Sequence, residues 1–145
     1  MNLILDASIT LAWCITRSDP SEAALAQEAL NFVRLNRAQV PALWYAEILN
    51  TLVVFERAKR LSPEDSSNFL NDLDTLWIDQ DLTLPSDTQS RVLAAARTHQ
   101  LTAYDATYFE LAHRKNASLA TFDRQLAGAF RKAGGHVFGD TPDTP

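Results

Sequence analysis

Short apolar runs alternate with longer amphipathic stretches along almost the whole of this chain. The runs expected to form strands are Asn2–Leu5, Ala38–Ala42, Leu76–Leu84, Leu101–Tyr104, Ser118–Phe122 and His136–Phe138. The expected helices are Ala7–Cys14, Glu22–Asn36, Leu43–Lys59, Pro63 to Leu73 or Leu76, Pro85–His99, Ala106–Lys115 and Arg124–Ala133. Because parallel strands need long crossover connections, the alternation predicts an α/β fold. We expect a mostly parallel sheet of about five strands, covered by helices on both faces.

The length of 145 residues suits a single domain, expected over residues 1–138. Residues 139–145 contain two Pro and two Asp and are expected to form a disordered tail. Cys14 is the only cysteine, which excludes an internal disulfide and fits a reducing compartment. The first residues lack the basic leader of a signal peptide, and no stretch approaches the roughly 20 apolar residues of a membrane span. We therefore expect a cytoplasmic protein that does not contact a membrane.

The net charge of −5 argues mildly against a protein that binds nucleic acid through a broadly basic surface. It does not exclude a nucleic-acid substrate. Bound metal ions can neutralise part of an acidic site and part of the phosphate charge.

Three aspartates occupy the same kind of position, directly after an expected strand and before an expected helix. They are Asp6, Asp105 and Asp123. Ligands of open α/β sheets bind beyond the carboxyl ends of the strands, so adjacent parallel strands would bring these carboxylates into one crevice. Asp is also a good helix N-cap, and three independent caps explain the positions about equally well.

A fourth acid, Glu47, lies about one turn into the expected helix Leu43–Lys59. The surrounding positions, among them Trp44 and Ile48, are mostly apolar, and Asn50 shares the face of Glu47. A solvated polar stripe would explain this pair. However, a charge within an apolar helix usually has a partner, and a metal site at the start of the helix would provide one.

Clustered carboxylates repel one another and raise each other's pKa. Mg²⁺ or Mn²⁺ would relieve this repulsion, because both ions prefer oxygen ligands. Ser8 lies two residues from Asp6, and Thr121 lies two residues from Asp123. Their hydroxyls could bind a metal-bound water or a phosphate, or serve as ordinary cap or turn hydroxyls. Arg124 could touch a phosphate, although a solvated surface arginine is the favoured interpretation.

Other catalytic chemistries lack their sequence patterns. The three histidines show no ligand spacing with one another or with Cys14, which argues against a zinc site. No serine lies in a nucleophile-elbow pattern. All four glycines lie between Gly128 and Gly139, so a glycine-rich phosphate loop is absent from the sequence. Aromatic residues beside the acids, such as Tyr108, are expected to pack in the core.

Taken together, the motifs resemble the PIN-domain family, and within it the VapC-type toxins of prokaryotic toxin–antitoxin pairs. The matching segments are Leu5-Asp6-Ala7-Ser8 with Trp13, Val40-Pro41-Ala42-Leu43-Trp44 with Glu47 and Asn50, Leu101-Thr102-Ala103-Tyr104-Asp105-Ala106 with Tyr108, and Leu119-Ala120-Thr121-Phe122-Asp123-Arg124 with Leu126. Each motif is weak alone, but their order and spacing are specific. The resemblance covers about Asn2 to Phe138. Gln100 stands where relatives often have glycine, and basic residues are sparse near the acids.

The resemblance implies a PIN-like three-layer α/β/α sandwich and an endoribonuclease that depends on Mg²⁺ or Mn²⁺. It implies acidic ligands at Asp6, Glu47, Asp105 and Asp123, and the polar helpers Ser8, Asn50 and Thr121. It also implies an RNA substrate, a homodimer, and a small VapB-like antitoxin that covers the groove of the site. Asp123 is the acid whose direct contact with metal is least expected.

Two alternatives remain open from the residues. Asp6-Ala7-Ser8-Ile9-Thr10 resembles the opening D-x-D-x-T of haloacid-dehalogenase-like phosphotransferases, with Asp6 as nucleophile, but Ser8 replaces the second Asp. The chain could also be a non-catalytic PIN-like binding module. Such modules often lose the acids, which are all present here.

Overall fold

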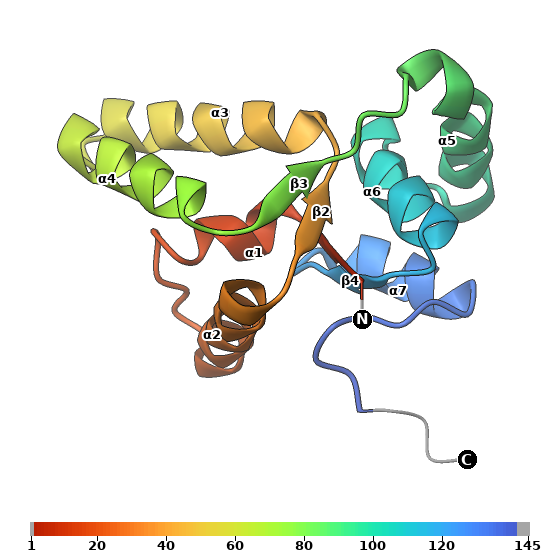
Figure 1. The fold of residues 1–145 in the computed structure, drawn as a ribbon, viewed down its shortest axis with the longest axis horizontal. Coiled ribbons are helices and arrows are strands. Elements are labelled where there is room, and N and C mark those ends of the chain that lie inside the picture. Colours follow the sequence, from red (N-terminus) through yellow and green to blue (C-terminus); the bar gives the residue numbers. More distant parts are fainter. Residues whose placement is uncertain (1, 142–145) are drawn as a thin grey trace.

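A four-stranded parallel sheet forms the centre of the computed structural model, which describes residues 2–141 (Figure 1). The strands are β1 (Leu3–Leu5), β2 (Ala38–Val40), β3 (Ile78–Gln80) and β4 (Ser118–Ala120). They lie in the order β3-β2-β1-β4, and every pairing is parallel. Leu3 is aligned with both Ala38 and Ser118, so the carboxyl ends of β2, β1 and β4 meet at one edge of the sheet.

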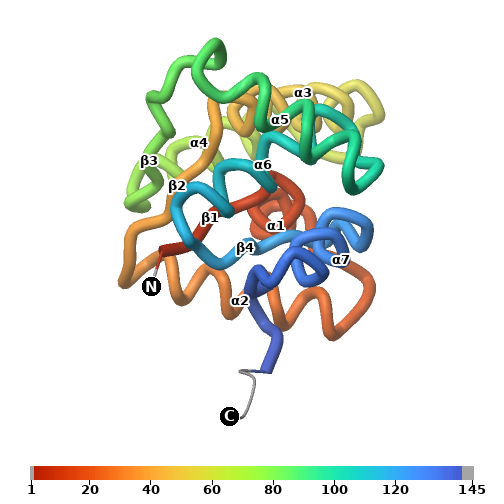
Figure 2. The backbone as a smooth tube through the Cα atoms, turned by 90° about the vertical axis from the view of Figure 1, so that its right-hand side faces the viewer, coloured from red at the N-terminus to blue at the C-terminus, as the bar shows by residue number. Residues whose placement is uncertain are grey.

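Helices flank this sheet on both sides. They are α1 (Ala7–Leu11), α2 (Pro20–Leu35), α3 (Leu43–Arg57), α4 (Pro63–Asp74), α5 (Pro85–His99), α6 (Ala103–Arg114) and α7 (Arg124–Lys132). Figure 1 shows α1 to α4 on the left of the strands and α5, α6 and α7 on the right. Figure 2 shows the molecule from that right-hand side. The arrangement confirms the expected α/β/α sandwich. None of the helices within residues 2–141 is long and apolar enough to cross a membrane.

Two adjacent strands, β1 and β4, supply the middle of the core. Leu3, Ile4 and Leu5 of β1 and Leu119 of β4 are at most 1% exposed. Strands buried on both faces are continuous apolar runs rather than alternating ones, which explains why these strands were identifiable from the sequence. By contrast, β3 lies at the edge of the sheet and is partly exposed.

Several helix boundaries confirm their sequence signals. The Ser62 hydroxyl accepts a hydrogen bond from the Asp65 amide at 3.0 Å, and the Asp65 carboxylate accepts one from the Ser62 amide at 3.0 Å. This capping box satisfies free amides at the start of α4. At the other end of the chain, Gly134 follows α7 with a φ of 89°, a conformation that favours glycine.

The expected strand Leu101–Tyr104 is wrong, because α6 already begins at Ala103. Gln100 ends α5 in the left-handed conformation, with a φ of 55°, and the chain turns directly into the next helix. The Thr102 hydroxyl then caps α6 by accepting a hydrogen bond from the Asp105 amide at 3.1 Å. Asp105 therefore lies in the first turn of a helix and does not follow a strand.

Two other strand predictions are too long. The run Leu76–Leu84 contains only β3, and its last leucines are solvent-exposed. The segment His136–Phe138 forms a single parallel bridge between Val137 and Leu119. The described residues thus form four strands instead of about five. Residues 142–145 of the expected tail lie outside the described part, whereas Asp140 forms an ion pair with Arg131 at 2.6 Å.

Candidate metal centre

The carboxyl edge of the sheet and two helix starts position the four acids. Asp6 directly follows β1, and Asp123 lies three residues after the end of the neighbouring β4. Glu47 lies in the second turn of α3, which follows β2 after a short connection, and Asp105 lies in the first turn of α6. Four segments that are distant in the sequence therefore bring one carboxylate each to the same end of the molecule.

Asp6 is the most enclosed of these acids, with only 6% of its surface exposed. It is the N-cap residue of α1, yet its side chain makes no capping bond. Instead, its Oδ2 accepts hydrogen bonds from the Ser8 hydroxyl at 3.0 Å and from the Thr121 hydroxyl. Because Thr121 follows β4, this second bond joins the ends of two adjacent strands. The capping explanation therefore fails for Asp6.

The predicted helpers Ser8 and Thr121 are linked to the backbone as well as to Asp6. The Ser8 hydroxyl accepts a hydrogen bond from the Phe122 amide at 3.1 Å. The Thr121 hydroxyl accepts one from the Asp123 amide at 3.0 Å. Both hydroxyls thus orient the Asp6 carboxylate and connect it to the segment that carries Asp123.

Glu47 is held by Tyr108, for which core packing was the favoured interpretation of the sequence. The Tyr108 hydroxyl donates a hydrogen bond to Oε1 of Glu47 at 2.7 Å, although Tyr108 itself is only 1% exposed. Tyr108 is three residues after Asp105 on α6, so the bond connects two helices that each carry an acid. The spacing Asp105-x-x-Tyr108, which places both side chains on one helix face, is the signal that could have indicated this role.

A second buried contact fixes α3 relative to α1. The Trp44 indole donates a hydrogen bond to the Thr10 hydroxyl at 3.1 Å, and that hydroxyl donates to the Asp6 carbonyl at 3.2 Å. Both side chains are buried, and Trp44 precedes Glu47 by three residues. No local pattern in the sequence indicates that Thr10 or Trp44 supports the site.

Asp123 caps a helix and also acts electrostatically on a neighbouring acid. Its Oδ1 accepts a hydrogen bond from the Leu126 amide at 2.8 Å, which caps α7. Its charge also acts on Asp105, as described below. Asn50, the remaining predicted helper, is exposed on α3, one turn after Glu47.

The electrostatics tie the four acids together. Burial raises the pKa of Asp6, although its hydrogen bonds counteract part of this effect. Burial also raises the pKa of Glu47, and the charges of Asp6 and Asp105 add to it. The pKa of Asp105 is raised by burial and then by the charges of Asp123 and Asp6. Each carboxylate is thus within electrostatic reach of at least one other.

The cluster lacks a protein cation to balance it. Within residues 2–141, no lysine, arginine or histidine forms an ion pair with any of the four acids. Partly buried carboxylates without a counter-charge are costly, and a hard dication with a preference for oxygen ligands would lower that cost. The donor set therefore fits Mg²⁺ or Mn²⁺.

The fit is not that of a closed cage. In the part of the chain that the structure describes, no three acidic, histidine or cysteine side chains already lie as close together as metal ligands do. Mg²⁺ usually keeps several waters and binds through one or two carboxylates, so a site of this kind does not need a full protein cage.

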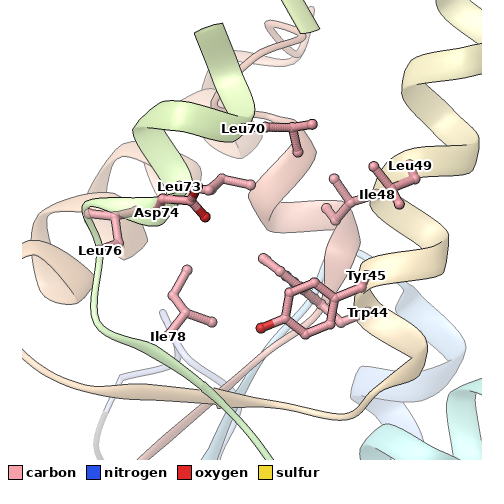
Figure 3. Close-up of a pocket in the computed structure, with 9 residues that line it drawn as sticks. All are labelled: Trp44, Tyr45, Ile48, Leu49, Leu70, Leu73, Asp74, Leu76 and Ile78. Atoms are coloured by element: carbon pink, nitrogen blue, oxygen red, sulfur yellow. The ribbon is translucent and has the colours of Figure 1, made fainter. Parts of the chain in front are cut away.

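Two apolar hollows lie outside this cluster. The groove in Figure 3 has a volume of about 210 Å³ between α3 and α4, with Tyr45, Leu49, Leu70 and Leu76 in its walls. A larger hollow of about 860 Å³ lies between the β3–α5 connection, α5 and α6. Its lining includes Leu43 of α3 and both Ala103 and Thr107, which flank Asp105 on α6.

The sequence of this chain is similar to those of known proteins. The family model of the PIN domain matches residues 3–132. Ribonuclease VapC3 of Pyrobaculum aerophilum is 30% identical over 132 residues, which cover 90% of this chain and 95% of that protein.

Solved structures share the fold. A crystal structure from Pyrobaculum aerophilum matches with a TM-score of 0.67 and 22% identity, covering 89% of this chain and 84% of that one. A toxin–antitoxin complex from Klebsiella pneumoniae matches with a TM-score of 0.61 and 16% identity over 87% of this chain and 91% of that one. FitAcB from Neisseria gonorrhoeae matches with a TM-score of 0.62 and 18% identity over 94% and 96%.

Proposed function

This chain belongs to the PIN-domain family, and we propose that it is a metal-dependent endoribonuclease, the toxin of a VapC-type toxin–antitoxin pair. The observation that carries the proposal is the group of four carboxylates around Asp6, three of which have a raised pKa and none of which is paired with a cation within residues 2–141. A relative named as a ribonuclease aligns over nearly the whole chain, which supports the same reaction class.

Asp6, Glu47 and Asp105 are the residues that would hold Mg²⁺ or Mn²⁺, with Asp123 as a direct or water-mediated ligand. When bound, the ion supplies an activated water and stabilises negative charge on the phosphate. The chain's own residues prepare the ligands. Ser8 and Thr121 orient the Asp6 carboxylate, and Tyr108 fixes one oxygen of Glu47. Histidine is not required as a general base in this scheme.

The proposal is tested by comparing wild-type protein with Asp6→Asn on a labelled single-stranded RNA in the presence of Mg²⁺ or Mn²⁺. We expect wild-type protein to release products with a 5′-phosphate and a 3′-hydroxyl, and the variant to lose at least about 100-fold in rate. Asp72→Asn, which removes an exposed carboxylate of α4, serves as the control and should cut normally. Cleavage by Asp6→Asn at the wild-type rate would refute the assignment.

The two alternatives make different predictions. A phosphotransferase would form a covalent aspartyl-phosphate on Asp6, but Ser8 stands at the position of the second acid and donates a hydrogen bond to Asp6. A binding module would not need a metal, so failure to bind Mn²⁺ in calorimetry would favour it over the nuclease.

We also propose a small antitoxin as partner, in line with the toxin–antitoxin complex among the structural relatives. The apolar groove between α3 and α4 lies on the helix that carries Glu47 and offers exposed leucine and tyrosine side chains (Figure 3). Expression of the wild type should arrest growth, Asp6→Asn should not, and co-expression of the antitoxin should restore growth. Arrest by both forms would point away from nuclease toxicity.

A further inference from the structure

An RNA strand brings one negative charge per nucleotide, whereas the proposed site is itself a group of carboxylates in a chain with a net charge of −5. A dication at the site can offset the charge of the phosphate that is cleaved. The neighbouring phosphates still need cations, because phosphate contacts supply most of the affinity for nucleic acids. A cationic surface next to the acids is therefore required by the proposed function.

A hollow of about 410 Å³ between the end of α5 and one face of α7 has this character. Its lining residues are Thr98, His99, Gln100, Arg124, Gln125, Gly128, Ala129 and Lys132. No acidic side chain is among them. By contrast, the groove of Figure 3 contains Asp74, and the hollow of about 860 Å³ contains Asp81 and Glu110.

The two strong cations of this hollow are available for a ligand. Within residues 2–141, neither Arg124 nor Lys132 forms an ion pair, whereas Arg17, Arg114 and Arg131 are all paired with acids. Asp19, at the start of α2, lies within electrostatic reach of Arg124 but not in an ion pair with it.

The two cations lie on one row of α7. The row consists of every fourth residue of the helix, namely Arg124, Gly128 and Lys132. Residues four apart share a helix face. The row is about 12 Å long from the first to the last. Gly128 leaves its middle open, because a Cβ atom built at this position would meet no atom within 4 Å.

The row begins beside the acids, since Arg124 directly follows Asp123. The opposite wall is the end of α5, where backbone carbonyls would repel an anion. One of them is covered, because the Gln125 side-chain amide donates a hydrogen bond from Nε2 to the Gln100 carbonyl at 2.7 Å. The hollow thus presents two cations without an ion-pair partner, the first of them directly after Asp123.

We propose that this hollow is a phosphate-binding site for the RNA backbone, in which Arg124 and Lys132 hold phosphates on one side of the cleaved bond. The inference rests on the proposed ribonuclease function and names the surface that binds its substrate. It also changes the interpretation of Arg124 from a solvated surface residue to a substrate-binding residue.

The test measures binding of a fluorescein-labelled single-stranded oligouridylate over a range of KCl concentrations, with all variants in the non-cleaving Asp6→Asn protein. Lys132→Gln should reduce the slope of log K against log salt by about 0.7, the value for one phosphate contact on a single strand. Arg57→Gln is the matched control, because Arg57 is likewise an exposed cation in the last turn of a helix, and α3 ends far from α7 (Figure 1).

Gly128 offers a second pair of variants that does not remove a native contact. Gly128→Glu and Gly128→Gln both place a side chain in open space and favour the helix, so both should fold. The glutamate puts a negative charge between the two cations and should weaken binding about 10-fold, whereas the glutamine should change it by less than about 2-fold.

Equal losses in Lys132→Gln and Arg57→Gln, or equal affinities of the two Gly128 variants, would overturn the phosphate site. A separate assay of RNA cleavage, with wild-type Asp6 in place, tests the proposed ribonuclease function independently of the phosphate-binding site. RNA cleavage without these binding differences would support the ribonuclease function and contradict the phosphate-binding site. Binding differences without cleavage would support the phosphate-binding site and contradict the ribonuclease function.

Discussion

Asp6 is held by hydroxyl groups instead of cations, which should lower the stability of the protein without metal. Ser8 and Thr121 stabilise its charge only in part, since burial still raises its pKa. Burial likewise raises the pKa of Glu47 and the pKa of Asp105. Functional carboxylates of this kind cost stability in the protein without metal, and the cost is recovered when a cation binds.

The pKa of Glu47 gives a stability prediction with a definite sign. Because its folded-state pKa is raised, mainly by burial and then by Asp6 and Asp105, the native state holds this proton to higher pH than the unfolded state. The native state therefore loses stability as pH rises through that window. Glu47→Gln should raise the melting temperature in EDTA at pH 7.5 by about 2 °C, a small effect because Glu47 is only partly buried.

The comparison of wild type and Glu47→Gln at lower pH is the internal control. Near pH 4 the wild-type carboxylate is largely protonated, so the difference in melting temperature should shrink. Addition of Mn²⁺ should reverse the order, because only the wild type keeps the full ligand set. A variant that is less stable than the wild type at pH 7.5 in EDTA would contradict the electrostatic account.

Tyr108 should affect metal affinity through its hydrogen bond to Glu47. Tyr108→Phe removes only the hydroxyl that donates to Oε1 of Glu47 and leaves the buried ring in place. Loss of such a supporting hydrogen bond typically weakens metal binding about 10-fold or more. Calorimetric titration with Mn²⁺ measures this, with Tyr104→Phe as control because Tyr104 is exposed on the same helix. Equal affinities of the two variants would exclude the positioning role.

At the level of the elements, the first turn of α6 joins folding to function. Thr102 caps this helix through the Asp105 amide, so the cap and a proposed metal ligand lie in the same turn. In α4, Ser62 and Asp65 form the corresponding cap far from the acids in the sequence. Removing either cap should destabilise the protein by a similar amount, so a difference in RNA cleavage between the two variants would report on the site alone.

Thr102→Ala and Ser62→Ala should each lower the free energy of unfolding by about 1 kcal/mol, as loss of an N-cap usually does. Only Thr102→Ala should also reduce RNA cleavage, because the turn that carries Asp105 loses its cap. Chemical denaturation and initial cleavage rates measure the two effects separately. Equal cleavage by both variants would show that the cap supports the fold alone.

At the level of the whole molecule, the surface between β3 and α5 is unusually apolar. Leu82 and Leu84 are 82% and 63% exposed, and they line the hollow of about 860 Å³ beside α5 and α6. Arg114 holds this connection in place, since it forms ion pairs with Asp81 at 2.6 Å and Glu110 at 2.7 Å. Leucines exposed on a fixed segment are typical of an interaction surface, and the homodimer that the family resemblance implies predicts self-association there.

Wild-type protein should accordingly have the mass of a dimer in size-exclusion chromatography with light scattering. Leu84→Lys should shift this mass to the monomer, because a charge would be buried at the interface. Leu35→Lys is the control, since Leu35 is 86% exposed on α2 and lies outside the hollow. A dimer that survives Leu84→Lys would exclude this surface as its interface.

The sequence predicted the helices better than the strands, for identifiable reasons. Caps and prolines are local signals, and Pro20, Pro63 and Pro85 are the first residues of α2, α4 and α5. Leu101–Tyr104 was mistaken for a strand because its composition is apolar, although Thr102 and Asp105 have the same spacing as the capping pair Ser62 and Asp65.

The sequence alone determined which acids to consider, since Asp6 and Asp123 follow apolar strands and Glu47 interrupts an apolar helix face. The sequence also determined that helices cover both faces of a parallel sheet, because the alternation of strand and helix patterns can be identified from local hydrophobic periodicity. The tertiary structure decided what surrounds the acids. The bond from Tyr108 to Glu47 and the bond from Thr121 to Asp6 join residues 61 and 115 positions apart. Such pairings depend on strand order and helix packing, which local patterns do not specify.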